Sequence, residues 1–362
     1  MPRAKSLDYI FLFAVLALSA VGLVMIFSAS PTLGIKLGDS FYFIKRHIFY
    51  LLLGFLALLF GFRLDLELLK KRANTIFIVA VLLLLLVYIP GIGRKVLGAS
   101  RWIDLGVLVF QPSELMKFAT VLVLAGFLSG RKEKIGDLFQ GFLPPIILVG
   151  FVFALIVKQP DLGTALTIAV TGFVMLFAAG ADLRHLGAFG GLGLLGVLAL
   201  SIASPYRLRR LLSYLDPWQD PQGAGFQIIQ SLLAVGSGGL LGLGLGASRQ
   251  KYFYLPQQFT DFIFAILCEE LGFIGGAAVA GLFCLFAARG LLIALSAADP
   301  FKKLLAAGLV AWVASQALLN IMVVIGLVPT TGIPLPFISY GGTATIINLF
   351  AVGVILNISR KP

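Results

Sequence analysis

Long apolar runs separated by short polar joints dominate the hydropathy pattern of this 362-residue chain. Runs of about 20 residues match the length that an α-helix needs to cross a bilayer. The ten-residue alternation of apolar and polar positions that is typical of a membrane β-barrel is absent. The pattern therefore predicts about ten membrane-spanning helices, at residues 8–28, 47–62, 73–90, 113–130, 140–157, 163–180, 183–203, 258–288, 303–327 and 339–358.

Composition supports this reading, because 59% of the residues are hydrophobic and only 12% are charged. Soluble domains contain about 25% charged residues. We therefore expect an all-α integral membrane protein, organised as a single polytopic domain over residues 1–362. The start Met-Pro-Arg-Ala-Lys resembles a signal peptide, but no small-residue cleavage site ends the first apolar run, which we interpret as an uncleaved span.

An even number of spans places both termini on one side of the membrane. Short joints on that side are rich in lysine and arginine, which predicts that it is cytoplasmic. These cations are Arg3, Lys5, Arg63, Lys70, Lys71, Arg72, Arg131, Lys132, Lys134, Arg184, Arg289, Lys302, Lys303, Arg360 and Lys361. The net charge of +12 is thus spread over segment ends and loops, which fits lipid head groups or an anionic ligand better than nucleic acid.

The opposite side also keeps cations in short joints, against the topological bias. Lys45, Arg46 and Arg101 form this group. Cations retained there indicate an anionic ligand at the outer face, and anchoring to lipid head groups is the alternative.

Two segments depart from the pattern of spans and short joints. Residues 204–257 form a long loop whose Phe226–Gly236 part fits the membrane interface. Its glycine run 236–246 lacks the Lys-Ser/Thr ending of a phosphate loop, so we expect close backbone packing against the membrane instead. Residues 328–342 are too apolar for an ordinary loop and too rich in proline and glycine for a helix. We expect this segment to re-enter the protein and line a cavity.

Asp261 is the strongest candidate for chemistry, because a carboxylate at the start of an apolar segment is costly to desolvate. Such an acid is suited to act as a general base on a hydroxyl group, since an interfacial site raises its pKa. The structural alternative is a helix N-cap, formed by Thr260 or Asp261.

Other charged residues lie inside predicted spans. Glu114 and Lys117 are three residues apart and so share one helix face, where they form either a structural bridge or part of a ligand path. The outer turn Lys158–Asp161 carries both signs of charge, and both a structural and a functional role remain open for it. For Glu269 and Glu270 we favour a structural role, with one of them paired to a neighbouring cation.

The sequence offers little for a dedicated metal centre. His47 and His185 are far apart in the sequence, and Cys268 and Cys284 lie roughly 24 Å apart on one predicted helix. These cysteines cannot form a disulfide with each other. A divalent cation such as Mg²⁺ or Mn²⁺ that bridges a carboxylate and a diphosphate remains open, because such ions need only one or two protein carboxylates.

Several motifs, in one order along the chain, carry a family resemblance. They are Arg101-Trp-Ile-Asp-Leu-Gly, Gln111-Pro-Ser-Glu-Leu-Met-Lys117, Gln159-Pro-Asp-Leu-Gly-Thr-Ala165, Thr260-Asp-Phe-Ile-Phe264, Glu269-Glu-Leu-Gly272 and Gly332-Ile-Pro-Leu-Pro-Phe-Ile-Ser-Tyr-Gly-Gly342. The chain resembles the SEDS (shape, elongation, division, sporulation) proteins from its first span to its last. Its short termini make it more similar to the RodA branch than to the FtsW branch. Gln257 and Gln258 depart from the family pattern, since many members carry an acid there.

The resemblance implies a ten-helix peptidoglycan glycosyltransferase of the bacterial inner membrane, which polymerises lipid II together with a class B penicillin-binding protein. Asp261 matches the essential aspartate of the family, in the extracellular loop between spans seven and eight. Glu114 and Lys117 match the charge pair of the fourth span.

The resulting hypothesis is an inverting glycosyl transfer between two undecaprenyl-diphosphate-linked sugars at the periplasmic face, for cell elongation and shape. Asp261 would take the proton of the acceptor hydroxyl. The cations that would neutralise the diphosphate are Lys45, Arg46, Arg101, Arg207 and Arg210.

Two alternatives remain. A lipid II flippase predicts polar groups through the full membrane depth and, often, repeated halves. We find no internal repeat, and the polar groups gather towards the outer side, which favours the enzyme. A non-catalytic membrane scaffold would leave Asp261 dispensable.

Overall fold

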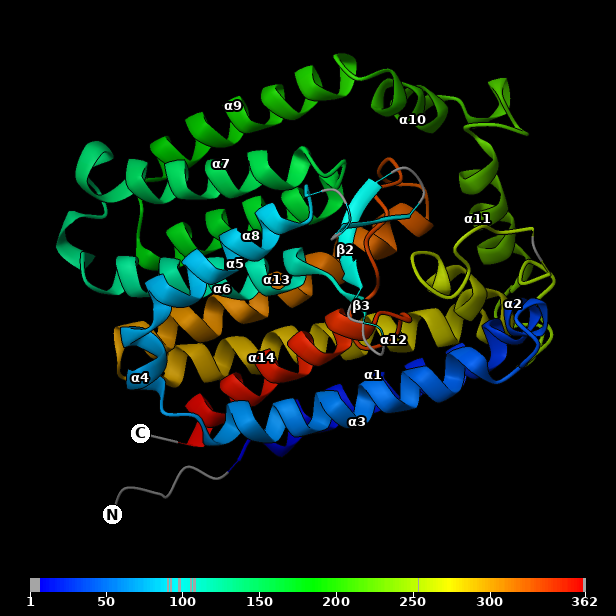
Figure 1. The fold of residues 1–362 in the computed structure, drawn as a ribbon, viewed down its shortest axis with the longest axis horizontal. Coiled ribbons are helices and arrows are strands. Elements are labelled where there is room, and N and C mark those ends of the chain that lie inside the picture. Colours follow the sequence, from blue (N-terminus) through cyan, green and yellow to red (C-terminus); the bar gives the residue numbers. More distant parts are fainter. Residues whose placement is uncertain are drawn as a thin grey trace.

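The computed structural model describes residues 7–89, 91, 93–96, 99–104, 106, 109–252 and 254–360. Long helices run side by side along one direction, and the first and the last helix have their outer ends, near Tyr9 and Arg360, at the same end of the bundle (Figure 1). That arrangement agrees with the even number of spans. Of the predicted inner-side cations, Arg3, Lys5, Lys361 and the side chain of Lys132 lie outside the described residues.

Within the described residues, nine helices are long and apolar enough to cross a membrane. They are α1 (Tyr9–Ala29), α3 (Tyr42–Arg63), α6 (Pro112–Ser129), α7 (Leu143–Val157, extended by a π turn from Leu138), α8 (Leu162–Ala179), α9 (Leu183–Ile202), α12 (Ile263–Ser296), α13 (Pro300–Val324) and α14 (Gly342–Arg360).

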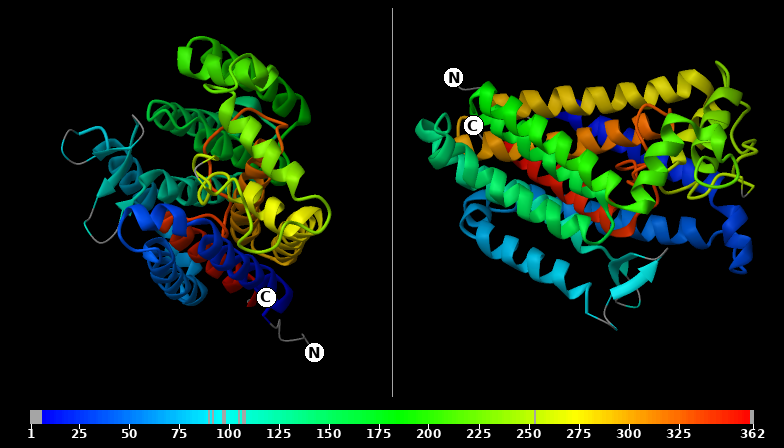
Figure 2. Two further views of the ribbon diagram at one scale, coloured as in Figure 1. Left: turned by 90° about the vertical axis from the view of Figure 1, so that its right-hand side faces the viewer. Right: turned by 90° about the horizontal axis from the view of Figure 1, so that it is seen from above.

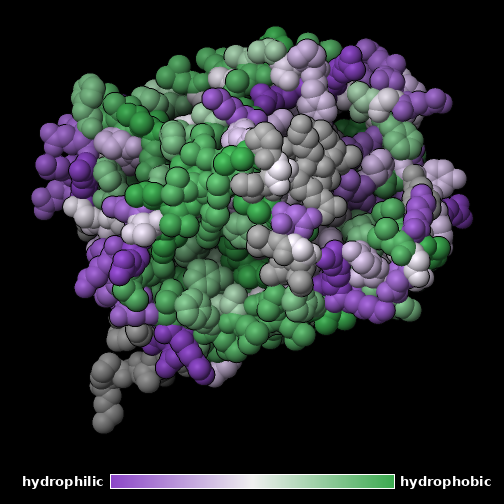
Figure 3. Space-filling model, in the orientation of Figure 1, coloured by the Kyte–Doolittle hydropathy of each residue, from purple (hydrophilic) through white to green (hydrophobic). Residues whose placement is uncertain are grey.

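The remaining predicted span, 73–90, corresponds to α5 (Ala73–Leu86). Its 14 residues cover about 21 Å, short of a hydrocarbon core of about 30 Å. Apolar surface fills the centre of the molecule, and polar surface gathers at its left and right ends (Figure 3). The structure thus confirms an all-α membrane fold with about ten apolar helical segments.

Shorter elements occupy the ends of the bundle. Helices α2 (Pro31–Lys36), α10 (Pro205–Leu215) and α11 (Phe226–Ser237) lie at one end, and α4 (Leu66–Lys71) lies at the other (Figure 1). The joint after α5 holds an antiparallel sheet of three strands, β1 (Gly93–Val96), β2 (Ala99–Asp104) and β3 (Val109–Phe110), in the order β1-β2-β3. The hydropathy pattern did not predict these strands, because each is too short to show a period.

Aspartates fix the starts of several spans. The side chains of Asp8, Asp161, Asp182 and Asp299 each accept a hydrogen bond from a backbone N–H in the first turn of α1, α8, α9 and α13. These bonds satisfy amide groups that have no partner within the helix.

The centre of the bundle is formed by α6, α13 and α14, whereas α9 is almost fully exposed. Helix α14 packs closely on α3, and α13 packs on both α8 and α12. Seen end-on, α9 and α10 form one margin of the molecule (Figure 2). The candidate charge pair of Glu114 and Lys117 lies on α6, one of these buried helices.

Helix α12 is broken at Gly272, whose backbone has φ 67° and ψ −167°. The glycine run 236–246 inserts at this break: the N–H groups of Leu243 and Gly244 donate to the carbonyls of Glu269 and Glu270. In return, Gly239 O accepts from the N–H of Phe273. The expected close backbone packing is present, and it is made against α12 rather than against the membrane.

The Pro/Gly-rich segment 328–342 folds back between α13 and α14, and residues 335–339 are buried. Side chains bind its carbonyl groups: Gln316 donates to Pro334 O at 2.9 Å and Asn320 donates to Ile333 O at 2.8 Å. Irregular backbone is therefore covered by protein, as membrane depth requires.

Candidate active site

Asp261 lies in the turn that leads into α12, whose N-cap is Phe262, with no side-chain cap bond. The capping alternative is therefore wrong for both Thr260 and Asp261. Thr260 instead donates from its hydroxyl to the side chain of Gln257, at 2.8 Å. The carboxylate of Asp261 is partly exposed.

The backbone of this turn is held on both sides. Gln257 adopts a left-handed φ of 56°, and its carbonyl accepts from the N–H groups of Thr260 and Phe262, both at 3.2 Å. The carbonyl of Asp261 accepts from the side-chain amide of Asn320 at 2.7 Å. The carbonyl of Thr260 accepts from the hydroxyl of Ser339 at 2.5 Å. Helix α13 and the segment 328–342 thus fix the position of the carboxylate.

The environment of Asp261 shifts its acidity. Burial raises the pKa of its carboxyl to about 6, and the nearby carboxylate of Asp161 also raises this pKa. Arg210 and Arg101 act in the opposite direction. An acid with a pKa near 6 is a better proton acceptor than an ordinary aspartate, whose pKa is about 3.9.

Arg101 and Arg210 approach Asp261 from different elements. Arg101 of β2 donates from Nε to the carbonyl of Gln159 at 3.0 Å, and a second nitrogen donates to the carbonyl of Pro160. Arg210 of α10 donates to the carbonyl of Thr330 at 2.9 Å, with its guanidinium over the ring of Tyr206. Both arginines therefore lie near a carboxylate while being held by backbone carbonyls.

The other candidate cations are placed differently. Arg207 donates to the carbonyl of Val157, at the end of α7. Lys45 forms an exposed ion pair with Asp39 at 2.9 Å, and this hydrogen bond lowers the pKa of Asp39. Arg46 donates to the hydroxyl of Tyr42 at 2.8 Å.

Arg46 is nevertheless linked to the Asp261 turn. It lies close enough to Tyr340 to lower the pKa of that phenol, which burial raises to about 12. The N–H of Tyr340 donates to the carbonyl of Phe259 at 2.9 Å, two residues before Asp261. Arg101 and Arg210 thus act on Asp261 itself, and Arg46 acts on Tyr340, whose backbone binds the Asp261 turn.

Glu114 and Lys117 form a buried ion pair of 2.9 Å, with both side chains 2% exposed. Glu114 lies in the first turn of α6, after Pro112 at the start of the helix. The ammonium group of Lys117 also donates to Gln316 Oε1 at 2.7 Å and lies 5.0 Å from the centre of the Trp312 ring. Gln316 in turn binds the segment 328–342, so the pair is connected to the wall of the Asp261 site.

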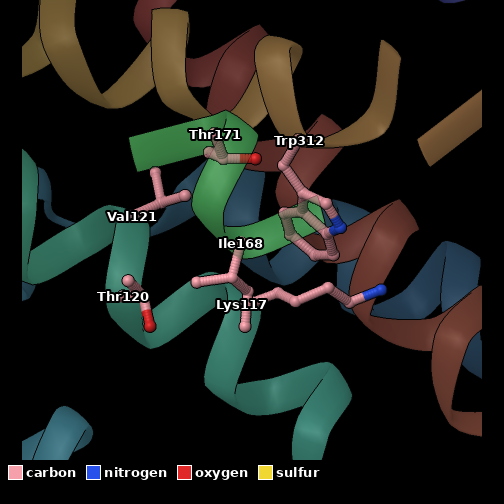
Figure 4. Close-up of a pocket in the computed structure, with 6 residues that line it drawn as sticks. All are labelled: Lys117, Thr120, Val121, Ile168, Thr171 and Trp312. Carbon is pink, nitrogen blue, oxygen red and sulfur yellow. The ribbon is translucent and has the colours of Figure 1, made fainter. Parts of the chain in front are cut away.

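Figure 4 shows Lys117 running beneath the indole of Trp312. The two residues line a narrow pocket with Thr120, Val121, Ile168 and Thr171, from α6, α8 and α13, that is too tight for a water molecule. The second carboxylate oxygen of Glu114 is buried without a hydrogen-bond partner.

Sequence reasoning left the role of Asp161 open and did not select Asn320. Asp161 is buried, caps α8, and faces the same carboxylate that Arg101 and Arg210 influence. Asn320 is a buried amide inside an apolar helix, which was a usable signal, because polar groups within a span are usually functional.

Among the described residues, no group of three or more histidine, cysteine, aspartate or glutamate side chains lies together. Asp161 and Asp261 are two carboxylates close enough to influence each other, and a Mg²⁺ or Mn²⁺ ion needs only one or two protein carboxylates besides water and substrate phosphates. Cys268 and Cys284 are both free, as their spacing predicted.

Comparison with known proteins identifies relatives along the whole chain. The family model for cell cycle proteins of the FtsW, RodA and SpoVE type matches residues 9–362. Stage V sporulation protein E of Bacillus subtilis (strain 168) is 46% identical over 359 residues, covering 99% of this chain and 98% of the relative. A probable peptidoglycan glycosyltransferase FtsW of Geobacter sp. (strain M18) is 44% identical over 362 residues, covering 100% and 99%.

Solved structures share this fold. A chain from a peptidoglycan synthase complex, described as coordinating polymerization and crosslinking, is 33% identical, with a TM-score of 0.81 and 98% coverage of both chains. The rod shape determining protein RodA of Thermus thermophilus is 31% identical, with a TM-score of 0.73, covering 99% of this chain and 98% of the other.

Proposed function

We propose, because the chain belongs to the FtsW, RodA and SpoVE family of peptidoglycan glycosyltransferases, that it polymerises lipid II with Asp261 as the general base. The 4-hydroxyl of the acceptor sugar loses its proton to the Asp261 carboxylate. The hydroxyl oxygen then bonds to the anomeric carbon of the donor, and undecaprenyl diphosphate leaves with the electrons of the broken bond. A single displacement inverts the α-linked donor to a β-linked product.

The observation that carries this proposal is the setting of Asp261. The backbone carbonyls of Thr260 and Asp261 are held by Ser339 and Asn320, and the carboxylate of Asp261 does not cap α12 and has a pKa of about 6. At neutral pH it is therefore ionised and still basic enough to accept a hydroxyl proton as the new bond forms.

The leaving diphosphate requires positive charge, and the cations around the site supply it. Arg101 and Arg210 carry the positive charges that act on Asp261 and lower its pKa. We therefore assign these two arginines to the reacting diphosphate. Arg207, Lys45 and Arg46 contact Val157, Asp39 and Tyr42, and we assign them to the second lipid-linked substrate. Preorganised cations stabilise charge that develops in the transition state, and they lose little energy to reorganisation.

We assign the Glu114–Lys117 pair a supporting role. Lys117 is tied through Gln316 to the carbonyl of Pro334, so the pair holds the segment that faces Asp261. If Mg²⁺ or Mn²⁺ binds, Asp161 and Asp261 would hold it, and it would supply further positive charge to the diphosphate.

The cellular setting follows from the same reading. We place the chain in the bacterial inner membrane, with both termini cytoplasmic and Asp261 at the periplasmic face, and with a class B penicillin-binding protein as partner. The similarity to a rod shape determining protein favours a role in elongation and shape, whereas relatives named FtsW point to division. Depletion separates the two roles, since rounded cells support elongation and filamentous cells support division.

The decisive experiment compares the wild type with Asp261→Asn, purified with its partner and supplied with lipid II in detergent. We expect glycan polymer from the wild type and none from the variant. Asp220→Asn is the matched control, because Asp220 is an exposed acid of the same loop, and it should keep wild-type activity.

Full polymerisation by a folded Asp261→Asn variant would remove the base assignment. Translocation of lipid II across vesicles without polymer formation would instead support the flippase. Dispensability of Asp261 in cells, together with absence of both activities, would support a scaffold.

A further inference from the structure

Two adjacent glutamates, Glu269 and Glu270, end the first half of α12, immediately before the break at Gly272. They are 1% and 0% exposed. A buried carboxylate is costly unless hydrogen bonds or a cation compensate it. Every described bond that these two side chains accept comes from the loop before Asp261 or from α1.

Glu269 binds the loop through its backbone and one hydroxyl. Its carboxylate accepts from Ser248 Oγ at 2.5 Å, from the N–H of Arg249 at 2.9 Å and from the N–H of Gln250 at 3.4 Å. One carboxylate therefore fixes three consecutive loop residues.

Glu270 forms the centre of a buried ion pair. Its Oε1 accepts from Nζ of Lys251 at 3.0 Å, and the hydroxyl of Ser28 in α1 lies 2.7 Å from both carboxylate oxygens. Lys251 is itself 4% exposed and also donates to the carbonyl of Gly246 at 2.5 Å. The pair thus joins the loop, α1 and α12 at one point.

A second anchor lies closer to Asp261. The side-chain amide of Gln258, which is 1% exposed, donates to the carbonyl of Ala29 and to the hydroxyl of Thr32, both at 2.9 Å. The hydroxyl of Thr32 donates in turn to the carbonyl of Lys251 at 3.0 Å. Both anchors therefore end on the same end of α1.

Together these contacts connect the loop before Asp261, the helix after it and the end of α1. The residues before it are tied to the end of α1, and the helix that follows it is tied back, through Glu269 and Glu270, to the loop. Replacing a buried ion pair by apolar side chains often leaves stability unchanged or improved. A requirement for overall stability alone therefore does not account for three buried charges at this place.

We infer that Glu270, Lys251 and Gln258 are positioning residues, which hold the Asp261 turn in the geometry that the reaction needs. This inference rests on the proposed function. None of the three residues touches the reacting atoms; they act through the backbone that carries Asp261. A displacement of about 1 Å at a catalytic group can cost about 100-fold in rate.

The test is steady-state kinetics of lipid II polymerisation by the full complex. Glu270→Gln and Lys251→Met each remove one partner of the ion pair. We expect kcat to fall by about 10- to 100-fold, with KM for lipid II within about threefold of the wild type, because substrate-binding groups are untouched.

The matched control is the ion pair between Asp8 and Arg289, at 2.6 Å, which also joins α1 to α12 but at the opposite end. Asp8→Asn and Arg289→Gln should leave kcat within about twofold of the wild type. A comparable loss of kcat in these control variants would overturn the inference, since it would show that general packing of α1 on α12 is responsible.

Gln258→Met keeps the inference testable if the charge variants do not fold, because it removes two hydrogen bonds at similar volume and leaves no charge unpaired. Its kcat should fall about tenfold with KM within about threefold. Folded variants with wild-type kcat, alongside an inactive Asp261→Asn, would refute the positioning role alone. An active Asp261→Asn would refute the proposed base instead.

Discussion

Asp161 and Asp261, the two carboxylates of the site, have different surroundings. Asp161 is buried and accepts hydrogen bonds from the N–H and the hydroxyl of Thr164. Asp261 is partly exposed, and its pKa is raised to about 6. Asp261 is the one suited to exchange a proton near neutral pH.

This difference predicts the pH dependence of polymerisation. A general base works only when ionised, so kcat/KM should fall as the pH drops through about 6, the raised pKa of Asp261. An unperturbed aspartate would keep the rate high down to about pH 4. The measurement is the rate of polymer formation from pH 4.5 to 8, and a flat profile across pH 6 would contradict the assignment.

Two neighbouring charges should shift, in opposite directions, the acidic limb of the pH profile, which is the range where kcat/KM falls. Asp161→Asn removes a like charge that raises the pKa of Asp261, so the limb should shift to lower pH. Asparagine at this position still caps α8. Arg210→Gln removes a cation that lowers the same pKa, so its limb should shift to higher pH. Shifts in one common direction would exclude an electrostatic origin.

For single residues, the sequence predicted which side chains to consider for the site, but not all of the interactions between them. It selected Asp261, predicted the face shared by Glu114 and Lys117, and expected a cation beside Glu269 or Glu270, which Lys251 supplies. It did not predict that Asp161 acts on Asp261. The two residues are 100 positions apart, and only packing of α8 against the segment 328–342 brings them together.

Among the helices, α12 departs most from its prediction. The sequence predicted one span at 258–288, and the structure has Ile263–Ser296 with a break at Gly272. Hydropathy does not reveal the break, because both halves are apolar. The cause lies in the glycine run 236–246, whose backbone groups replace the hydrogen bonds that α12 lacks there. Broken helices of this kind are tolerated where protein satisfies the freed backbone groups.

Gly272 should be the most sensitive glycine of α12. A Cβ at this position would lie 2.3 Å from the backbone nitrogen of Gly242, and its φ of 67° is unfavourable for any other residue. Gly272→Ala should lower the free energy of unfolding by about 2 kcal/mol or more, measured by thermal unfolding in detergent.

Gly281→Ala on the same helix provides the control. Nothing lies within 4 Å of a Cβ there, so alanine should be neutral or should stabilise by up to about 1 kcal/mol. Equal melting temperatures for the two variants would show that the break does not depend on glycine.

For the whole molecule, hydropathy was sufficient to predict the architecture. Apolar segments of the right length and cations at their ends predicted a bundle with both termini at one end, and the first and the last helix of the structure do have their outer ends together (Figure 1). The course of residues 328–342 back into the protein was also predicted, from their apolar and proline- and glycine-rich composition. Features that leave no mark on hydropathy were not predicted, including the small sheet after α5 and the break in α12. The side of the membrane on which each end lies still rests on the distribution of lysine and arginine.

That orientation can be measured with single cysteines. In a background with Cys268 and Cys284 replaced by alanine, Gly136→Cys places a thiol in the exposed joint between α6 and α7, and Gln222→Cys places one in the exposed loop after α10. A membrane-impermeant maleimide should label Gln222→Cys in intact spheroplasts, and should label Gly136→Cys only after permeabilisation. The reverse pattern would place Asp261 on the cytoplasmic side, where a polymerase of outward-facing glycan could not use it.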